Sequence, residues 1–126
     1  MSMENALARA HGSGSAQDGT QHWWAQRLSS LLLIPLVAWL IYAAVQLSGA
    51  DYDTAAAFVA RPLNSGVSIL VALTVFYHAR LGLQVVVEDY VHTPWLEITM
   101  QMSIKLFALV GALVATLAIL RITFGG

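Results

Sequence analysis

The sequence predicts an all-α integral membrane protein with three transmembrane helices. Of its 126 residues, 58% are hydrophobic and only 10% are charged, whereas soluble domains carry roughly 25% charged residues. Three stretches approach the roughly 20 apolar residues that cross a bilayer, at about 27–47, 65–91 and 98–124. The net charge of −1 provides no basic patch, which argues against nucleic acid as a partner and leaves the lipid bilayer as the surroundings.

Residues 1–21 are expected to form a flexible tail ahead of a membrane domain at residues 22–126. The tail lacks the apolar core of a secretory signal peptide, and it is rich in small and polar residues. Such a composition is typical of disordered termini. Cysteine is absent from the chain, so no disulfide and no iron–sulfur cluster can be held by its own thiolates.

The first span begins beside Trp23 and Trp24, whose indole rings favour the boundary between lipid and water. Pro35 lies inside this span and leaves the carbonyl of Leu31 without its usual donor. A kink, a bound partner or the ordinary tolerance of proline in membrane helices would each account for it.

The connections between the spans differ in length. Residues 48–64 include Gly49 and Pro62 and form a polar excursion, in which Ala55 to Ala57 favour a short surface helix. The second connection, DYVHTPWLE, is brief. We expect Pro94 to stop the second span and Trp95 to anchor the chain at the interface.

The third span carries a stripe of small residues at spacings of three and four, which are Ala108, Gly111, Ala112 and Ala115. Small side chains let another helix approach closely. The pattern does not distinguish a helix of the same chain from a helix of a partner subunit. No internal repeat is evident, which weakens a transporter interpretation.

Three spans place the N-terminus and the second connection on the same side of the membrane. Arg9, Arg27 and Lys105 mark that side, against Arg61 and Arg121 on the other. The positive-inside rule therefore predicts a cytoplasmic N-terminus.

Ionisable and polar groups gather in the stretch FYHARLGLQVVVEDYVH at residues 76–92. At about 100° per residue, His78, Gly82 and Asp89 share one helix face, and Tyr90 follows at the end. His78 is the only histidine expected deep in the hydrocarbon, where ionisable groups are functional hypotheses by default. Its imidazole could ligate haem iron, with Gly82 making room for the macrocycle, or it could bond to a carbonyl of the next helix.

The helix end suggests a second site. A phenol at Tyr90, supported by the Asp89 carboxylate, suits hydrogen bonding and proton delivery to a quinone. The alternative makes Tyr90 an interfacial anchor and Asp89 a solvated acid. Arg27 could hold haem propionates or contact lipid headgroups. Arg80 points about 200° away from His78 and is not assigned to its site.

The run HWWAQR at residues 22–27, the proline at position 35 and the run HARLGLQVVVEDYVH at residues 78–92 together resemble one known family. This is the hydrophobic membrane anchor of succinate dehydrogenase, the small cytochrome b anchor, in its alphaproteobacterial and mitochondrial-like branch. The resemblance implies a respiratory complex II in the bacterial inner (cytoplasmic) membrane. In it a flavoprotein subunit oxidises succinate, an iron–sulfur subunit carries the electrons, and a second membrane anchor subunit shares haem b with this chain while ubiquinone is reduced.

The resemblance also implies residue roles. His78 corresponds to the axial ligand of the haem iron, with the second ligand expected from the partner anchor, and Arg27 corresponds to an arginine near the propionates. Tyr90 and Asp89 correspond to the quinone site. The succinate site is on another subunit, so no catalytic residue is expected here. Two other functions stay open: a cofactor-free structural anchor, and a small channel or transporter subunit.

Overall fold

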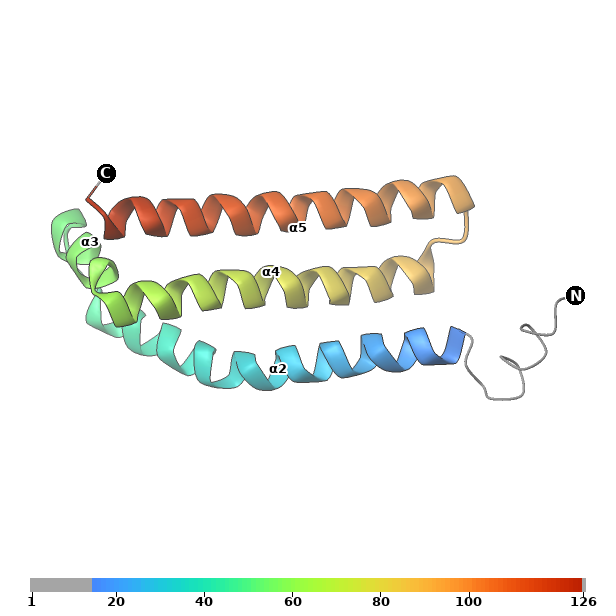
Figure 1. Ribbon diagram of the computed structural model, residues 1–126, viewed down its shortest axis with the longest axis horizontal. Coiled ribbons are helices and arrows are strands. Elements are labelled where there is room, and N and C mark those ends of the chain that lie inside the picture. The colour runs from blue at the N-terminus through green and yellow to red at the C-terminus, as the bar shows by residue number, and fades with distance from the viewer. Residues whose placement is uncertain (1–14, 126) are drawn as a thin grey trace, which may run out of the picture.

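A computed structural model of the chain describes residues 15–125, in which all regular structure is helical (Figure 1). The helices are α2 (Ser15–Gln46), α3 (Tyr52–Ala60), α4 (Pro62–Tyr90) and α5 (Pro94–Thr123). Three segments are long and apolar enough to cross a membrane: Gly19–Gln46, Pro62–Tyr90 and Pro94–Thr123. The predicted all-α membrane fold with three spans is therefore confirmed.

The helices are longer than the predicted spans, because a membrane helix continues through the headgroup region once it has left the hydrocarbon. Residues 15–21, which we assigned to the tail, are helical, and residues 1–14 lie outside the described part of the chain. The expected role of Pro94 is wrong. Helix α4 already ends at Tyr90, and Pro94 opens α5, where its fixed φ and missing N–H suit the first helical turn.

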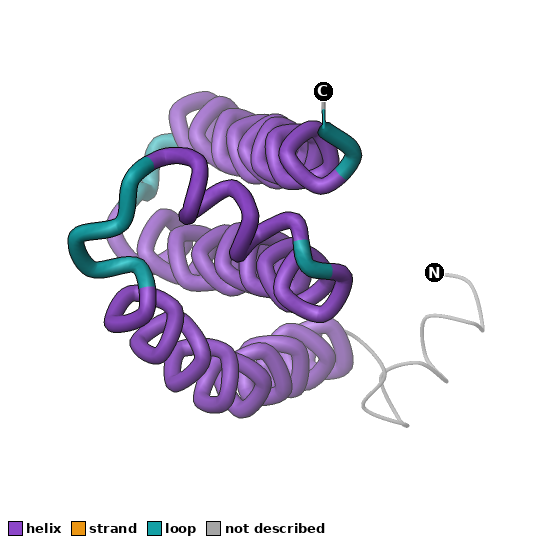
Figure 2. The backbone as a smooth tube through the Cα atoms, turned by 90° about the vertical axis from the view of Figure 1, so that its left-hand side faces the viewer, coloured by secondary structure: helices purple, strands orange, loops and turns teal. Residues whose placement is uncertain are grey.

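Helix α4 lies between α2 and α5 (Figures 1 and 2). The start of α2, the end of α4 and the start of α5 share one end of the molecule, and α3 lies across the other end (Figure 1). The short connection after α4 therefore lies on the same side as the beginning of α2, as three spans require.

The predicted surface helix in the first connection is α3. Its N-cap is Asp51, whose carboxylate accepts a hydrogen bond of 2.9 Å from the backbone N–H of Thr54. The hydrogen bonds of Thr54, first through its side chain and then through its backbone, lower the pKa of Asp51 from its ordinary value of 3.8. Just before the cap, Gly49 has φ 76°, a left-handed conformation that glycine adopts without strain.

Helix α3 joins α2 to the other two long helices. The ring of Phe58 stacks on Trp39 of α2 at 6.3 Å between centroids and lies 6.5 Å from Tyr42. The side-chain amide of Asn64, at the start of α4, donates a hydrogen bond of 2.8 Å to the carbonyl of Phe58. These contacts fix α2 at the end of the molecule far from its own N-terminus.

The small-residue stripe of α5 packs within the chain at Gly111. A Cβ added there would overlap the ring of Phe76 on α4, so glycine is needed for the two helices to lie this close. Ala108 and Ala112 instead line a groove between the helices. The sequence left open whether this stripe packs on the same chain or on a partner subunit. At Gly111 it packs on α4 of the same chain.

Few apolar side chains are buried by the chain itself. Within the described range they are Leu36, Ala43, Leu81 and Val87. Large side chains such as Leu63, Phe107 and Phe124 are more than 70% exposed. A surface of this kind fits lipid or neighbouring subunits, because apolar patches of such extent are rare on soluble monomers.

Candidate functional site

A polar seam runs between α2 and α4 in otherwise apolar helices. Residues His22, Gln26 and Ser29 recur at spacings of four and three on α2, so they share one face. That face meets α4 at His78.

The hydrogen bonds of Ser29 determine which nitrogen of His78 carries the proton. Ser29 is only 6% exposed, and its hydroxyl donates to the carbonyl of Gln26 at 2.9 Å. The same oxygen lies 2.8 Å from Nδ1 of His78. Because a hydroxyl has one proton to donate, Ser29 accepts at this second contact. Nδ1 of His78 is therefore assigned as the donor, and Nε2 is left with a free lone pair.

The two nitrogens of His78 separate the roles that the sequence left as alternatives. Nδ1 makes the contact with the neighbouring helix, although to a serine hydroxyl rather than directly to a carbonyl. Nε2 has no hydrogen bond within residues 15–125. A histidine that binds a metal through one ring nitrogen is usually oriented by a hydrogen bond that its other ring nitrogen donates.

Two further polar atoms of the seam lack partners. Nε2 of His22 and Oε1 of Gln26 are buried without a hydrogen bond among the described residues. Leaving such an atom unpaired costs about 1–3 kcal/mol, so each calls for an explanation such as an ordered water, an ion or a functional role. Nε2 of His22 could donate to a carboxylate such as a haem propionate, whereas Oε1 of Gln26 needs a donor such as a water molecule.

Gly82 lies on α4 one turn beyond His78. A Cβ built at this glycine would be 4.0 Å from Nε2 of Gln26 on α2, which is ordinary van der Waals contact. The neighbouring helix thus approaches Gly82. A larger residue could therefore fit at position 82 without displacing α2. Packing within the chain does not explain why glycine stands beside His78.

The end of α4 lies apart from this seam. Tyr90 is 79% exposed, and Asp89 is exposed beside it. Neither makes a hydrogen bond in the part of the chain that is described, whereas neighbouring Glu88 accepts one of 2.9 Å from Gln84. Twelve residues of helix separate His78 from Tyr90, about 18 Å along the axis. The predicted haem and quinone residues therefore occupy two levels of the membrane.

Arg27 is exposed at the start of the first span. Its guanidinium lies over the ring of Trp23, 5.4 Å from the centroid, and it forms no ion pair with another described residue. The charge is therefore free for an anion, and Trp23 holds it at the interfacial level.

Sequence reasoning missed Ser29. A signal was present, because His22, Gln26 and Ser29 form a polar stripe at helical spacing. The spacing alone does not show that these three residues face the same neighbouring helix.

Comparisons with known proteins agree with the resemblance. Residues 1–119 match the family model described as succinate dehydrogenase/fumarate reductase transmembrane subunit. A succinate dehydrogenase hydrophobic membrane anchor subunit from Rickettsia bellii is 33% identical over 103 residues, covering 82% of each chain. The succinate dehydrogenase membrane anchor subunit of Reclinomonas americana is 35% identical over 80 residues, covering 60% of this chain and 66% of the relative. No solved structure matches significantly.

Proposed function

Because this chain belongs to the succinate dehydrogenase/fumarate reductase transmembrane subunit family, we propose that it helps to bind haem b and ubiquinone. It is a multi-pass membrane anchor subunit of succinate dehydrogenase, and it works with other subunits of that enzyme. The finer proposal is that these are the flavoprotein, the iron–sulfur subunit and a second membrane anchor subunit in a bacterial inner membrane, with the N-terminus cytoplasmic. Residues 22–126 serve as the anchor domain, and residues 1–21 precede it.

The free Nε2 of His78 carries the haem part of the proposal. Its lone pair is available because Nδ1 donates to Ser29, and a neutral imidazole in this state is a good axial ligand. Bound haem would supply a one-electron carrier near the path from the iron–sulfur subunit to quinone. The unpaired Nε2 of His22 is a candidate donor to the haem periphery, and Arg27 is a candidate for a propionate.

The quinone part rests on the end of α4. Reduction of a quinone to a quinol consumes two protons, so the site needs a donor reachable from water. Tyr90 offers a phenol O–H at the mouth of the helix, and the carboxylate of Asp89 can pass protons to it from the aqueous side. Their exposure suits a site completed by neighbouring subunits.

A cofactor-free structural anchor is the principal rival. It predicts no role for the free nitrogen of His78 and leaves the unpaired atoms of His22 and Gln26 without explanation. A channel or transporter would need polar residues continued through all three spans, and the polar seam is confined to α2 and α4.

The test of the haem site is a His78→Ala variant of the assembled complex. We expect the haem b absorption of the purified complex to disappear, while succinate oxidation by a soluble dye is retained. His92→Ala is the matched control, since His92 is exposed just beyond α4, and it should leave the spectrum unchanged. An unaltered haem b spectrum in the His78→Ala complex would remove the axial assignment.

The test of the quinone site is Tyr90→Phe, which removes only the phenol oxygen. Loss of a strong hydrogen bond should slow quinone reduction by about tenfold to a hundredfold, with dye-linked succinate oxidation unaffected. Tyr52→Phe, also exposed but at the other end of the molecule, serves as the control. Equal loss of both activities in Tyr90→Phe would indicate failed assembly and contradict a role in quinone chemistry.

A further inference from the structure

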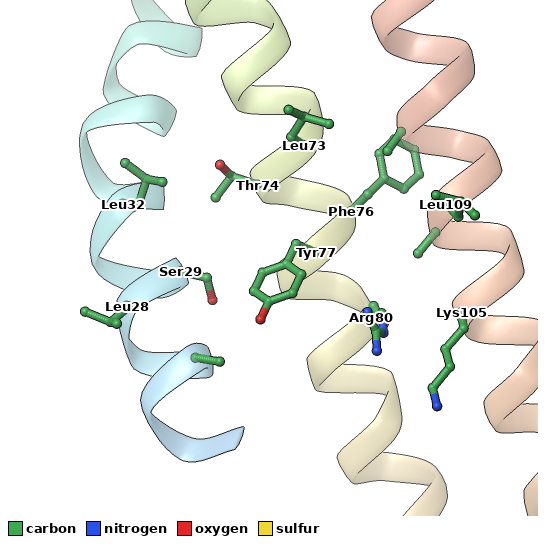
Figure 3. Close-up of a pocket in the computed structure, with 13 residues that line it drawn as sticks. Leu28, Ser29, Leu32, Leu73, Thr74, Phe76, Tyr77, Arg80, Lys105 and Leu109 are labelled. Carbon is green, nitrogen blue, oxygen red and sulfur yellow. The ribbon is translucent and has the colours of Figure 1, made fainter. Parts of the chain in front are cut away.

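A groove of about 700 Å³ lies between α2, α4 and α5, and its wall includes Ser29, the residue that contacts His78. Its walls include Leu28 and Leu32 of α2, Leu73 of α4 and Leu109 of α5. Leu28 and Leu32 lie at the left of the close-up, Leu73 at the top centre and Leu109 at the right (Figure 3). Ala112 of α5 adds a small residue to the wall, which widens the groove instead of filling it. This part of the groove is suited to hydrocarbon.

The other end of the groove is polar and cationic. Figure 3 shows the Tyr77 hydroxyl, the Arg80 guanidinium and the Lys105 ammonium all directed toward the end of α4 and the start of α5. Neither cation has a carboxylate partner between residues 15 and 125. Nε of Arg80 is moreover buried without any hydrogen bond. The groove therefore combines an apolar stretch with two positive charges that lack a carboxylate partner.

The depth of these charges makes their lack of partners costly. The 29 residues of α4 span about 43 Å, against roughly 30 Å of hydrocarbon, so an upright helix centred in the bilayer extends about 7 Å beyond each boundary. Ten residues separate Arg80 from the helix end, or about 15 Å, which places its Cα about 8 Å inside the hydrocarbon. Lys105 lies at a similar depth from the start of α5. Charges at such depth normally pair or reach the interface.

We propose that the groove binds one anionic phospholipid, whose phosphate lies between Arg80 and Lys105 and whose acyl chains follow the leucine-lined wall. A phosphate supplies the acceptor oxygens that both cations lack, and the hydroxyl of Tyr77 can donate to the same group. The cations point toward the membrane face where a headgroup lies, and the apolar wall extends toward the bilayer centre. The proposal does not require haem or quinone to be bound, and the groove adjoins the haem site only through Ser29.

The test uses the purified, assembled complex and native mass spectrometry. After delipidation, phosphatidylglycerol or phosphatidylcholine is titrated back and bound lipids are counted. The wild-type complex should retain one phosphatidylglycerol more than the Arg80→Gln, Lys105→Gln double variant, in which binding at this site weakens roughly tenfold or more. The control is Arg61→Gln, Arg121→Gln, which removes two exposed cations at the other end of the molecule and should retain the lipid.

Four outcomes would overturn the proposal. The double variant could retain as much phosphatidylglycerol as wild type, or the wild type could retain both lipids equally. Alternatively, the double variant could keep its lipid and lose the second anchor subunit, which would assign the cations to a carboxylate of that partner. Loss of the haem b spectrum in the double variant would likewise replace the lipid by haem propionates.

A second variant keeps the proposal testable if the charge variant fails to assemble. Ala112→Phe leaves both cations in place and fills the acyl-chain part of the groove, so phosphatidylglycerol should again be lost while the haem b spectrum persists. Retention of the lipid by Ala112→Phe would contradict the proposed position of the acyl chains.

Discussion

Helix α4 packs against its two neighbours in different ways. Against α5 it forms an extensive contact, which is apolar where Gly111 admits the ring of Phe76. Against α2 the contact is smaller and polar, formed by Ser29 and His78 beside buried atoms that lack partners. A bilayer offers no hydrophobic drive between helices, so close packing and hydrogen bonds must hold them. The α4–α5 contact at Gly111 is complete within the chain, whereas the α2–α4 contact at His78 needs a further group to complete it.

The largest effect should follow from breaking the polar interface at Ser29. Ser29→Ala removes the acceptor of the Nδ1 proton, so the imidazole of His78 is no longer fixed in one orientation and tautomer. Changes in this outer shell typically weaken metal binding by roughly 10–100-fold. We expect haem b to dissociate more readily from the purified complex. We also expect its reduction potential to rise, since a less basic imidazole stabilises ferric iron less.

The neighbouring serine provides a matched control. Ser30 donates to the same carbonyl of Gln26, at 2.8 Å, and makes no contact with His78. Ser30→Ala should leave haem affinity and potential at their wild-type values, and Ser29→Thr should restore both by returning the hydroxyl. If Ser29→Ala and Ser30→Ala behave alike in both measurements, Ser29 has no role in positioning His78.

The apolar interface should respond to a change in volume instead. Gly111→Val adds a branched side chain where the ring of Phe76 already lies, and overpacking of this kind costs about 1–3 kcal/mol. Thermal unfolding of the purified complex should begin at a lower temperature, with the haem b spectrum of the folded fraction unchanged.

Recovery of that stability distinguishes a packing effect from a general one. Phe76→Leu shortens the opposing side chain, so the double variant should regain part of the loss, and a double-mutant cycle gives the coupling between the two positions. Additive losses would show that Gly111 is required for a reason other than its contact with Phe76.

The two interfaces also differ in how far the sequence predicts them. Composition and length were enough for three spans, and the small residues around Gly111 indicated a close helix contact. They could not name the neighbour, because any helix can use such a face. Ser29 was missed because a serine in a membrane helix usually bonds the carbonyl of its own preceding turn. Ser29, Ser30 and Ser68 all do so here. Ser29 differs because the orientation of α2 turns it toward His78 of α4.

The roles of Arg80 and Lys105 depend on geometry in the same way. They are 25 residues apart in the sequence, and each alone reads as a cation that extends toward the headgroups. The antiparallel packing of α4 and α5 brings them to the same groove. That packing in turn depends on the close contact at Gly111, which a sequence pattern suggests but does not orient.

The smallest expected effect concerns α3, which fixes the far end of α2 through Phe58. The pKa of Asp51 is lowered in the folded protein from 3.8, so its cap is fully stabilising above that pH and is lost as the pH falls through the lower, folded value. Amide hydrogen exchange of α3 should therefore accelerate below pH 3.8. The α2–α4 interface should loosen with it, and the α4–α5 interface should keep its protection.

A substitution at the cap separates this titration from general acid effects. Asparagine caps a helix about as well as aspartate and does not ionise, so Asp51→Asn should make α3 protection nearly independent of pH in this range. Asp53→Asn, two residues on and outside the cap, should leave the wild-type dependence in place. If amide protection of α3 falls at low pH in Asp51→Asn as it does in the wild type, titration of the cap is not the cause. The α2–α4 interface must then be sensitive to pH through a different group.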